Sequence, residues 1–381
     1  MKYLLHTGFV IGCLVTPVCR AAAAGVDPES LPANTWTPFT PVFKGAEGRH
    51  IAVGWNKMVY DTAGKRVILM DRWKDALRDN TIYANAVIAV DPVAGTGEVL
   101  KLNNYKRQDV KGGKYKTVAL DELLAKDPTP VDRHPYGDLA FCDYNNSVYL
   151  GPGANRTWKR HPRDFWRFDL AKKTWHALDA AGSPGEAKRN MLESAMCYDA
   201  AARTLVFHNA RDNTTWLYDV VAGAWRRSAA KSYPRAGMAA AMTYDSKRQR
   251  ILLFGGPGSG GKSWNTPGPE LWAFSTQKDA WTRLADAPVP ARAPGLAYDS
   301  KHDIVLADIA AKGKPNTTLI YEPSRDRWST LQASGPKGSW MCLCYDTAND
   351  FFVRMAGGYA NARWWVLRYA PDTVPATKDD E

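Results

Sequence analysis

The sequence lacks the features that would identify a metalloprotein or a nucleic-acid-binding protein. Among its 381 residues are only six cysteines and seven histidines, and they do not follow the spacing of a metal site. We find no helix with a basic stripe and no nucleic-acid-binding motif, so DNA and RNA are not expected partners. The residues indicate no cofactor, although a divalent cation is compatible with them.

Long apolar runs are also scarce, and the one at the N-terminus is too short and wrongly flanked for a membrane anchor. It extends from Tyr3 to Val18, follows Lys2 and precedes the four alanines at 21–24. This pattern predicts a secretory signal peptide over residues 1–24 and therefore a secreted or periplasmic protein without a transmembrane segment. A lipoprotein-type site at Cys13 is the alternative interpretation.

Acidic residues are outnumbered by basic ones, and the formal net charge is +11. Removal of residues 1–24 would take away Lys2 and Arg20 but no acidic residue, which leaves +9. A basic exported protein is expected to bind an anionic partner, although net charge bears on association rather than on fold.

A repeat dominates the rest of the chain. Each copy begins with a Tyr-Asp pair, a polar turn and an apolar run, and most copies continue with an aromatic-acid segment, a second turn and a tryptophan. The pairs start at Tyr60, Tyr198, Tyr244, Tyr298 and Tyr345, with Tyr144-Asn145 as a sixth copy, and the tryptophans are Trp175, Trp225, Trp281 and Trp328. Four short strands in roughly fifty residues are typical of a propeller blade. The sequence therefore predicts an all-β propeller.

The number of copies predicts six blades over residues 34–371. The last copy lacks a fourth strand, and the N-terminal segment Asn34 to Phe39 looks like such a strand with its Trp36. Pairing of the two would close the ring and leave no free sheet edge. A seventh blade is the alternative, because the first two copies are widely spaced. We instead interpret residues 104–132 as an insertion with one helical stretch, Ala119 to Ala125, and residues 372–381 as a charged tail.

Four cysteines follow the signal peptide: Cys142, Cys197, Cys342 and Cys344. All lie within three residues of a repeat tyrosine, on the expected innermost strand. We expect small buried side chains, since free cysteine is among the most buried residues. A bridge between neighbouring blades is the alternative in an oxidising compartment.

One copy resembles a kelch repeat. From Pro234 to Leu284 it has Pro-Arg-Ala-Gly-Met-Ala, Tyr-Asp-Ser, Ile-Leu-Leu-Phe-Gly-Gly, Leu-Trp-Ala-Phe and Trp-Thr-Arg-Leu in order. The resemblance implies a kelch-type propeller similar to the central domain of galactose oxidase. Such propellers serve as binding platforms and as scaffolds of oxidases, lyases and hydrolases, so the fold alone implies no single activity.

The two faces of the predicted ring differ in their connections. The first-to-second and third-to-fourth strand turns are short and form a tight-turn face. The second-to-third strand loops and the links between blades are long and form a long-loop face. Function is usually carried by long loops on a rigid scaffold, so we expect the site on the long-loop face, around the axis.

Basic and aromatic residues gather in these long connections. A base precedes the first strand of each blade: Arg49, Arg133, Arg189, Arg235, Arg292 and Lys337. Further arginines and lysines are interleaved with aromatic residues, including Trp158 and Trp264. Guanidinium groups bind carboxylates and sulfates, and indole rings stack on sugars, so the set predicts an anionic polysaccharide or oligosaccharide. Bracing of neighbouring loops is the alternative role of these arginines.

Histidines sharpen this expectation, because four of them map to the long-loop face. His50 and His134 each follow the arginine that precedes a blade, and His208 replaces a glycine of the doublet and should point toward the axis. His161, Tyr136 and Asn190 fall nearby. Imidazole titrates near neutral pH and is the commonest proton-transfer group.

These residues favour a polysaccharide lyase that cleaves a uronate-containing glycan by β-elimination. His134 or His208 would remove the proton, Tyr136 or His50 would protonate the leaving oxygen, and Arg133, Arg189 and Arg235 would neutralise the carboxylate. The chain resembles secreted propeller lyases in size and in its histidines on one face.

Other functions remain open from the sequence. A monomeric, non-catalytic module that binds glycan or protein is the main alternative. A glycoside hydrolase would need two converging carboxylates, and no obvious pair is present. A copper oxidase would need a ligand from an added C-terminal domain, whereas this chain ends at the ring.

Overall fold

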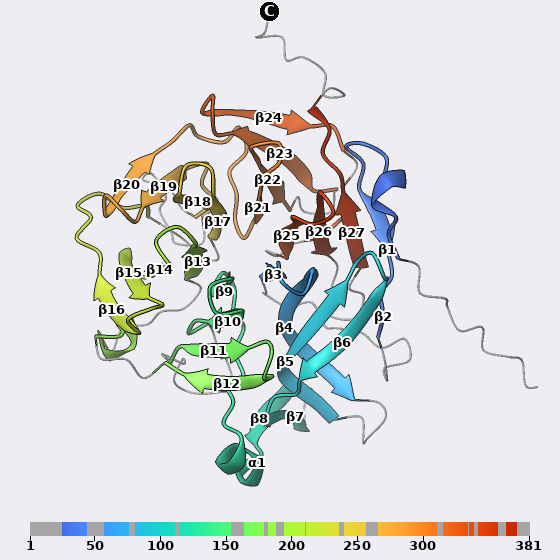
Figure 1. Cartoon of the computed structure of the whole chain (residues 1–381), viewed down its shortest axis with the longest axis vertical. Coiled ribbons are helices and arrows are strands. Elements are labelled where there is room, and N and C mark those ends of the chain that lie inside the picture. Colours follow the sequence, from blue (N-terminus) through green and yellow to red (C-terminus); the bar gives the residue numbers. More distant parts are fainter. Residues whose placement is uncertain are drawn as a thin grey trace, which may run out of the picture.

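The computed structural model describes fourteen stretches of the chain: 25–43, 57–75, 81–110, 114–153, 164–178, 182–187, 194–209, 211–235, 240–256, 266–310, 315–333, 335–338, 342–356 and 363–371. Within them, six small sheets stand around a common axis (Figure 1). The predicted all-β, six-bladed propeller is thereby confirmed. We number the blades along the chain and call their strands a to d from the axis outward.

Blades 2 to 5 are regular, and each consists of four consecutive antiparallel strands. Blade 2 contains β9 (Leu139–Cys142), β10 (Ser147–Leu150), β11 (Trp166–Asp169) and β12 (Thr174–Ala177). Blade 3 contains β13 (Ala195–Asp199), β14 (Thr204–Asn209), β15 (Thr214–Asp219) and β16 (Ala224–Arg227). Blade 4 contains β17 (Ala241–Asp245), β18 (Arg250–Phe254), β19 (Leu271–Ser275) and β20 (Ala280–Arg283). Blade 5 contains β21 (Gly295–Asp299), β22 (Ile304–Ile309), β23 (Thr317–Glu322) and β24 (Arg327–Leu331).

Blade 1 is enlarged. It contains β3 (Met58–Asp61), β4 (Arg66–Asp75), β5 (Thr81–Asp91) and β6 (Thr96–Lys101), and β2 (Val42–Phe43) pairs in parallel with β6. The segment predicted as an insertion forms a hairpin of β7 (Tyr105–Val110) and β8 (Lys114–Ala119), followed by helix α1 (Asp121–Lys126). The hairpin joins the sheet through β5 and projects with α1 from the ring (Figure 1). It is not a seventh blade.

Blade 6 joins the two ends of the chain. Its strands a to c are β25 (Leu343–Asp346), β26 (Phe351–Ala356) and β27 (Arg363–Leu367), and its strand d is β1 (Thr37–Phe39). Pro38 pairs with Trp365, which confirms that the N-terminal strand closes the ring. Two short 3-10 helices, η1 (Pro28–Ser30) and η2 (Pro184–Ala187), complete the described elements.

The Tyr-Asp pair recurs because it builds the tight a–b turn. In blade 5, Asp299 Oδ1 accepts hydrogen bonds from the backbone N–H groups of Lys301 (2.9 Å) and His302 (3.0 Å). The Tyr298 hydroxyl donates to Asp303 (2.9 Å), the last residue of the turn, which has a left-handed φ of 56°. A short polar side chain tolerates this conformation and satisfies the turn's own donors.

Blade 2 departs from this pattern and corrects one assignment from the sequence. Cys142 pairs with Ser147 at the start of strand b, as Asp199 pairs with Thr204 in blade 3. Phe141-Cys142 therefore occupies the place of the Tyr-Asp pair, and Tyr144 lies exposed within the turn. The two pairs were misaligned because Tyr144-Asn145 resembles the repeat in composition but lies three residues later.

The repeated tryptophans of strand d hold neighbouring blades together. Trp281 of blade 4 packs in a core cluster with Val206 and Leu217 of blade 3, and its indole N–H donates to Thr215 Oγ1 (2.9 Å). Trp36 of β1 makes the corresponding bond to Thr318 of blade 5 (3.2 Å). An indole supplies a large apolar surface and one N–H donor, which suits a partly polar interface between sheets.

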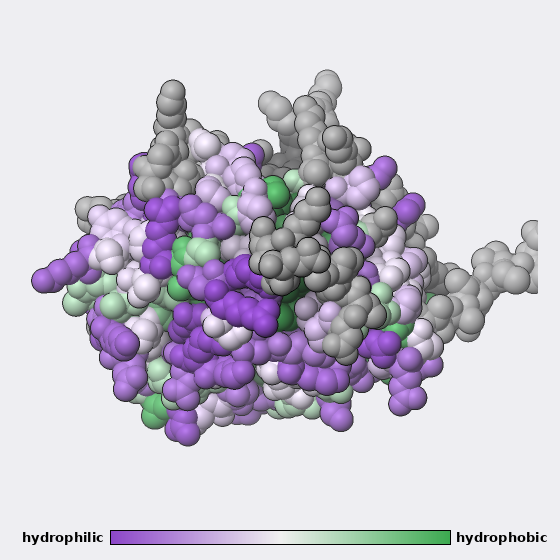
Figure 2. Space-filling model, turned by 90° about the horizontal axis from the view of Figure 1, so that it is seen from above, coloured by the Kyte–Doolittle hydropathy of each residue, from purple (hydrophilic) through white to green (hydrophobic). Residues whose placement is uncertain are grey.

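The outer rim of the ring is polar. Viewed from its edge, the surface is mostly hydrophilic, and apolar colour is confined to small separate areas (Figure 2). Among the described residues, none of the helices has the length and apolar character that a membrane crossing requires. The four cysteines that follow the predicted signal peptide are buried free thiols.

Candidate functional site

The residues predicted for the site divide into two groups. Arg49, His50, Trp158, His161, Arg189, Asn190 and Trp264 lie outside the described residues. Arg133, His134, Tyr136, His208, Arg235 and Arg292 lie within them. Three of the second group belong to a single connection, residues 133–138, which leads into strand a of blade 2.

This connection lies across the axis of the ring. Gly137 forms a parallel bridge with Ala195 of blade 3, and its carbonyl accepts a hydrogen bond from the Met196 N–H (2.9 Å). A Cβ atom on Gly137 would come within 2.9 Å of the Ala240 carbonyl of blade 4. Blades 2 and 4 are not neighbours, so a segment that touches both must lie near the centre of the long-loop face.

Tyr136 and His134 lie next to each other in this connection. Tyr136 is 2% exposed and packs in the core cluster that contains Ala241 of blade 4 and Leu296 of blade 5. Its φ of 49° is left-handed, as is that of Ala293 (51°) at the equivalent position of blade 5. The His134 ring lies 6.2 Å from the Tyr136 ring, between centroids, and His134 is only half-buried.

Arg133 has a bracing role. Its Nη2 donates to both carboxylate oxygens of Asp164 (3.0 Å each), and its Nη1 donates to the carbonyls of Gly151 and Asp164. Burial opposes ionisation of Asp164, but the charge and hydrogen bonds of Arg133 outweigh it and lower its pKa. With these bonds the guanidinium group ties residues 133–138 to the segment that leads into strand c of the same blade. This is the bracing role considered as the alternative for these arginines.

Arg235 and Arg292 are exposed on the surface of the ring. They precede strand a of blades 4 and 5, where they can meet an anionic ligand at the long-loop face.

His208 does not point toward the axis, which corrects that expectation. Ala195 pairs with His208 as Ala241 pairs with Phe254. His208 therefore takes the place of Phe254, the residue before the glycine doublet of blade 4, and not the place of a glycine. Its ring is fully buried and packs edge-on against Trp281 (5.4 Å), as Phe254 packs on Trp328 (5.1 Å). It thus lies between blades 3 and 4.

The polar contacts of His208 fit that buried position. Nδ1 lies 3.0 Å from the Thr215 hydroxyl. Burial lowers the pKa of His208 to about 4, although the Pro234 backbone and Asp212 oppose the shift. Desolvation disfavours the charged form, so this histidine is neutral at neutral pH.

A buried ion pair occupies the corresponding place between blades 5 and 6. Arg354 and Asp308 are both about 0–1% exposed, and Nε donates to Oδ2 at 2.6 Å. Arg354 also donates to the carbonyls of Cys342 (3.1 Å) and Met355 (3.2 Å), and Asn316 donates to the same Asp308 oxygen (2.7 Å). Burial raises the pKa of Asp308, and Arg354 opposes the shift.

A third buried group of charges involves Lys57 and Asp138. Both side chains are buried, and the Lys57 ammonium donates to the Met196 carbonyl (2.9 Å). Burial raises the pKa of Asp138 to about 8, although the Gly153 N–H group, Lys57 and Arg133 oppose the shift. Burial lowers the pKa of Lys57, and Cys197 and Asp138 oppose that. Perturbed buried groups of this kind mark candidate functional sites.

Sequence inspection missed Lys57 and Asp138 because blade 2 was aligned on Tyr144. In the observed register both occupy the same place, three residues before the tyrosine position of strand a. We call this the entry position, and its occupants are Lys57, Asp138, Ala195, Ala241, Gly295 and Cys342. Four blades have a small side chain there, so two opposite charges in adjacent blades were a signal within the sequence.

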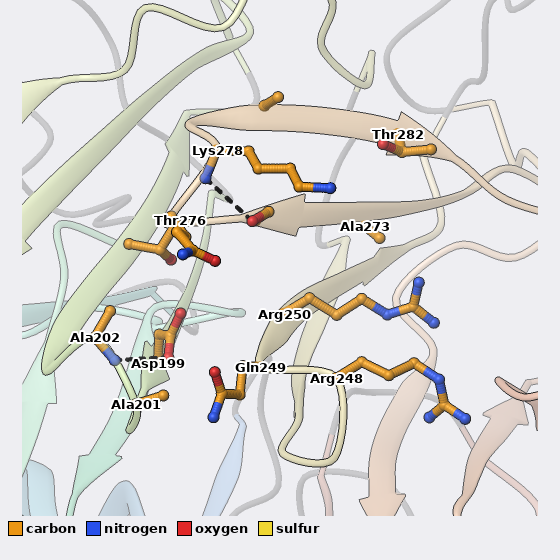
Figure 3. Close-up of a pocket in the computed structure, with 13 residues that line it drawn as sticks. Asp199, Ala201, Ala202, Arg248, Gln249, Arg250, Ala273, Thr276, Lys278 and Thr282 are labelled. Carbon is orange, nitrogen blue, oxygen red and sulfur yellow. Dashed lines mark hydrogen bonds between the residues drawn. The ribbon is translucent and has the colours of Figure 1, made fainter.

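The tight-turn face carries a groove of about 630 Å³ under blade 4. Arg248, Arg250 and Lys278 line it and extend in the same direction (Figure 3). Arg248 is bound to Asp303 (2.7 and 2.9 Å) and Arg250 to Asp245 (2.9 Å). The lining contains no aromatic ring for a sugar to stack on, and two of its three cations are already paired.

Asp299, His302 and Asp350, on the same face, place one nitrogen and two carboxylate oxygens within 4.8 Å of one another. That spacing could hold a cation, but a structural role explains it. His302 donates to Asp299 (2.7 Å) from the third turn position, as Arg248 does to Asp245 and Asn349 to Asp346. Asp350 is further bound by the Tyr345 hydroxyl (2.7 Å) and Lys301.

Comparisons with known proteins give the fold no family: no family model matches the chain, and no curated protein is significantly similar to it. The class of this protein is therefore defined by the geometry alone, as a six-bladed β-propeller.

Proposed function

We propose that this protein is an exported, kelch-type propeller that binds a uronate-containing polysaccharide at its long-loop face and cleaves it by β-elimination. The observation that carries the proposal is the position of His134, half-buried beside Tyr136 in a connection that lies across the ring axis. A ligand bound over the axis would meet this imidazole first.

The chemistry requires a base, a carboxylate neutraliser and an acid. In the proposed reaction His134 takes the proton α to the uronate carboxylate, a C4–C5 double bond forms, and the C4–O bond breaks with its electrons on the leaving oxygen. Arg235 and Arg292, exposed on the same face, would neutralise the carboxylate and so stabilise the enolate-like transition state. Tyr136 is too buried to touch the sugar and would orient the imidazole. The proton for the leaving oxygen remains assigned to His50.

The test is to incubate the protein with pectic, glucuronan, alginate, ulvan and gum-type substrates and to follow the ultraviolet absorbance of an unsaturated product. His134→Ala should lower the rate by about 10² to 10⁴, the usual contribution of a general base. The matched control is His176→Ala, because His176 is an exposed histidine of β12 in the same blade. A His134→Ala enzyme as active as the wild type would refute the assignment.

A non-catalytic glycan-binding module is the second candidate, and one observation favours it. Arg133 and His208, two residues expected to act on the substrate, are engaged inside the protein. Retained glycan binding without unsaturated product on every substrate would support the module.

A further inference from the structure

Lys57 and Asp138 stand out because they break the repeat at the same position in adjacent blades. The other entry positions carry Ala195, Ala241, Gly295 and Cys342, which leave the space between innermost strands to apolar packing. In blade 5 the fit is so close that a Cβ atom on Gly295 would lie 2.8 Å from the Leu343 side chain. Two buried ionisable groups, one basic and one acidic, are therefore a local departure from the packing of the other blades.

Asp138 fastens the connection to its own blade. Its N–H group donates to the Pro135 carbonyl (2.8 Å), and its carbonyl accepts from the Gly151 N–H (2.8 Å). The side-chain oxygen Oδ2 accepts from the Gly153 N–H (3.0 Å). Gly153 has a φ of 59° and no room for a Cβ atom, which would lie 2.4 Å from the His134 carbonyl. Asp138 thus binds the loop that packs directly against His134.

Lys57 holds the strand of blade 3 to which the same connection is bound. Its ammonium group comes from blade 1 and donates to the Met196 carbonyl. The N–H group of the same Met196 donates to the Gly137 carbonyl. A buried ammonium needs its hydrogen-bond acceptor, because burial of an unpaired polar group is costly. Met196 is therefore held on one side by Lys57 and on the other by Gly137.

We propose that Lys57 and Asp138 are positioning residues that clamp the 133–138 connection from blades 1, 2 and 3, so that the placement of His134 and Tyr136 depends on the protonation of this buried pair. The catalytic consequence rests on the proposed function, whereas the clamp itself does not.

The charges around the pair give the dependence its sign. Lys57 and Asp138 act on each other, and the other titratable or charged groups that act on them are Cys197 of β13 on Lys57 and Arg133 on Asp138. Asp138 keeps its proton up to a pKa of about 8 in the folded protein, whereas an unfolded aspartate ionises near pH 4. The folded state binds the extra proton between these values, so the contribution of Asp138 to the stability of the wild type should fall as pH rises from about 4 to 8. Lys57 contributes a rise with pH only above its own lowered pKa.

Asp138→Asn tests this sign without removing the hydrogen-bond acceptor for Gly153. Relative to the wild type, the variant should become more stable from pH 5 to pH 8, by on the order of a hundredfold in the unfolding equilibrium constant measured in urea. The matched control is Asp199→Asn, since Asp199 is a buried carboxylate of β13 at the opposite face. An Asp138→Asn profile parallel to that of the wild type would overturn the proposal.

Lys57→Met tests the clamp directly. Hydrogen exchange of the Met196 and Gly153 amides should accelerate at least tenfold, while exchange at the tight-turn amide of His302 stays unchanged. Unchanged exchange at Met196 would also overturn the proposal, and if this variant does not fold, Asp138→Asn decides alone. When a substrate is identified, Asp138→Asn should shift the pH profile of kcat with little change in KM. If the wild type forms no unsaturated product in the substrate screen but Lys57→Met still accelerates exchange at Met196 and Gly153, the lyase proposal is refuted and the clamp is supported.

Discussion

On the tight-turn face the same contacts recur from blade to blade, whereas the buried polar groups of the long-loop face each occur once. Blades 4 and 5 both use the turn residues after the aspartate to bind the next blade: Arg248 binds Asp303, and His302 lies 3.7 Å from Asp350. By contrast, among the described residues the buried groups His208 and Arg354 have no polar equivalents in neighbouring blades, and Lys57 has only Asp138, a group of the opposite kind. Recurrence indicates a contact that builds every blade, and a single occurrence indicates one that the other blades fold without.

The difference also has an energetic side. Contacts on the tight-turn face are partly solvated, and Arg248 is 23% exposed. His208, Arg354 and Asp308 are fully buried, so each of them depends on its polar partner. Variants at the two faces should therefore differ in size of effect as well as in kind.

The largest effect is expected at the buried pair of blades 5 and 6. Asp308→Ala leaves the Arg354 guanidinium buried without its carboxylate and should lower the free energy of unfolding by about 3–5 kcal/mol. Urea denaturation measures it. The double variant Asp308→Leu/Arg354→Met should recover most of the loss, because an apolar pair needs no charge partner. Equal instability of the single and double variants would contradict this account.

A pH-dependent effect of intermediate size is expected at His208. Its folded pKa of about 4 lies below the unfolded value near 6.5, so the unfolded state binds more protons between these pH values. The contribution of His208 to stability should be complete above pH 6.5 and fall by about 3 kcal/mol as pH approaches 4. His208→Gln, which can still bond to Thr215, should flatten this part of the stability profile. The exposed His176 provides the comparison. Burial lowers its pKa in the same direction, but its side chain is mostly in solvent, so its replacement should flatten the slope much less than His208→Gln does.

The smallest effect is expected on the tight-turn face. Asp303→Ala removes the acceptor of Arg248, Lys247 and the Tyr298 hydroxyl, at a partly solvated junction. Because solvent replaces much of what is lost, the free energy of unfolding should fall by only about 1 kcal/mol. Thermal unfolding at low and high salt would measure it, and added salt should shrink the difference. A loss as large as that of Asp308→Ala would break the comparison between the faces.

The fold was largely predictable because its rules are repeated. The Tyr-Asp turn and the strand-d tryptophan recur often enough to count blades. The missing fourth strand of the last copy, together with Trp36, predicted the closure by the N-terminal strand. The error in blade 2 arose because Phe141-Cys142 occupies the backbone position of the Tyr-Asp pair but has neither its hydroxyl nor its carboxylate.

The candidate site was less predictable, since it depends on register and on contacts between blades. His208 was displaced by one position within its strand, which turned a residue between two blades into one expected at the axis. Arg133 was correctly placed on the 133–138 connection, but only the structure brings Asp164 to it. Lys57 and Asp138 become visible in the sequence only after the register of blade 2 is known.

The closure of blade 6 has a consequence for the order of events during folding. β1 and β27 pair although more than 300 residues separate them, so the contact closes a loop that contains all the other described strands, β2 to β26. During synthesis, which begins at the N-terminus, β1 stays unpaired until the residues of β27 (Arg363–Leu367) have been made. In that interval both edges of the open ring can pair with other chains. Refolding of this propeller should therefore be most sensitive to protein concentration in its last step.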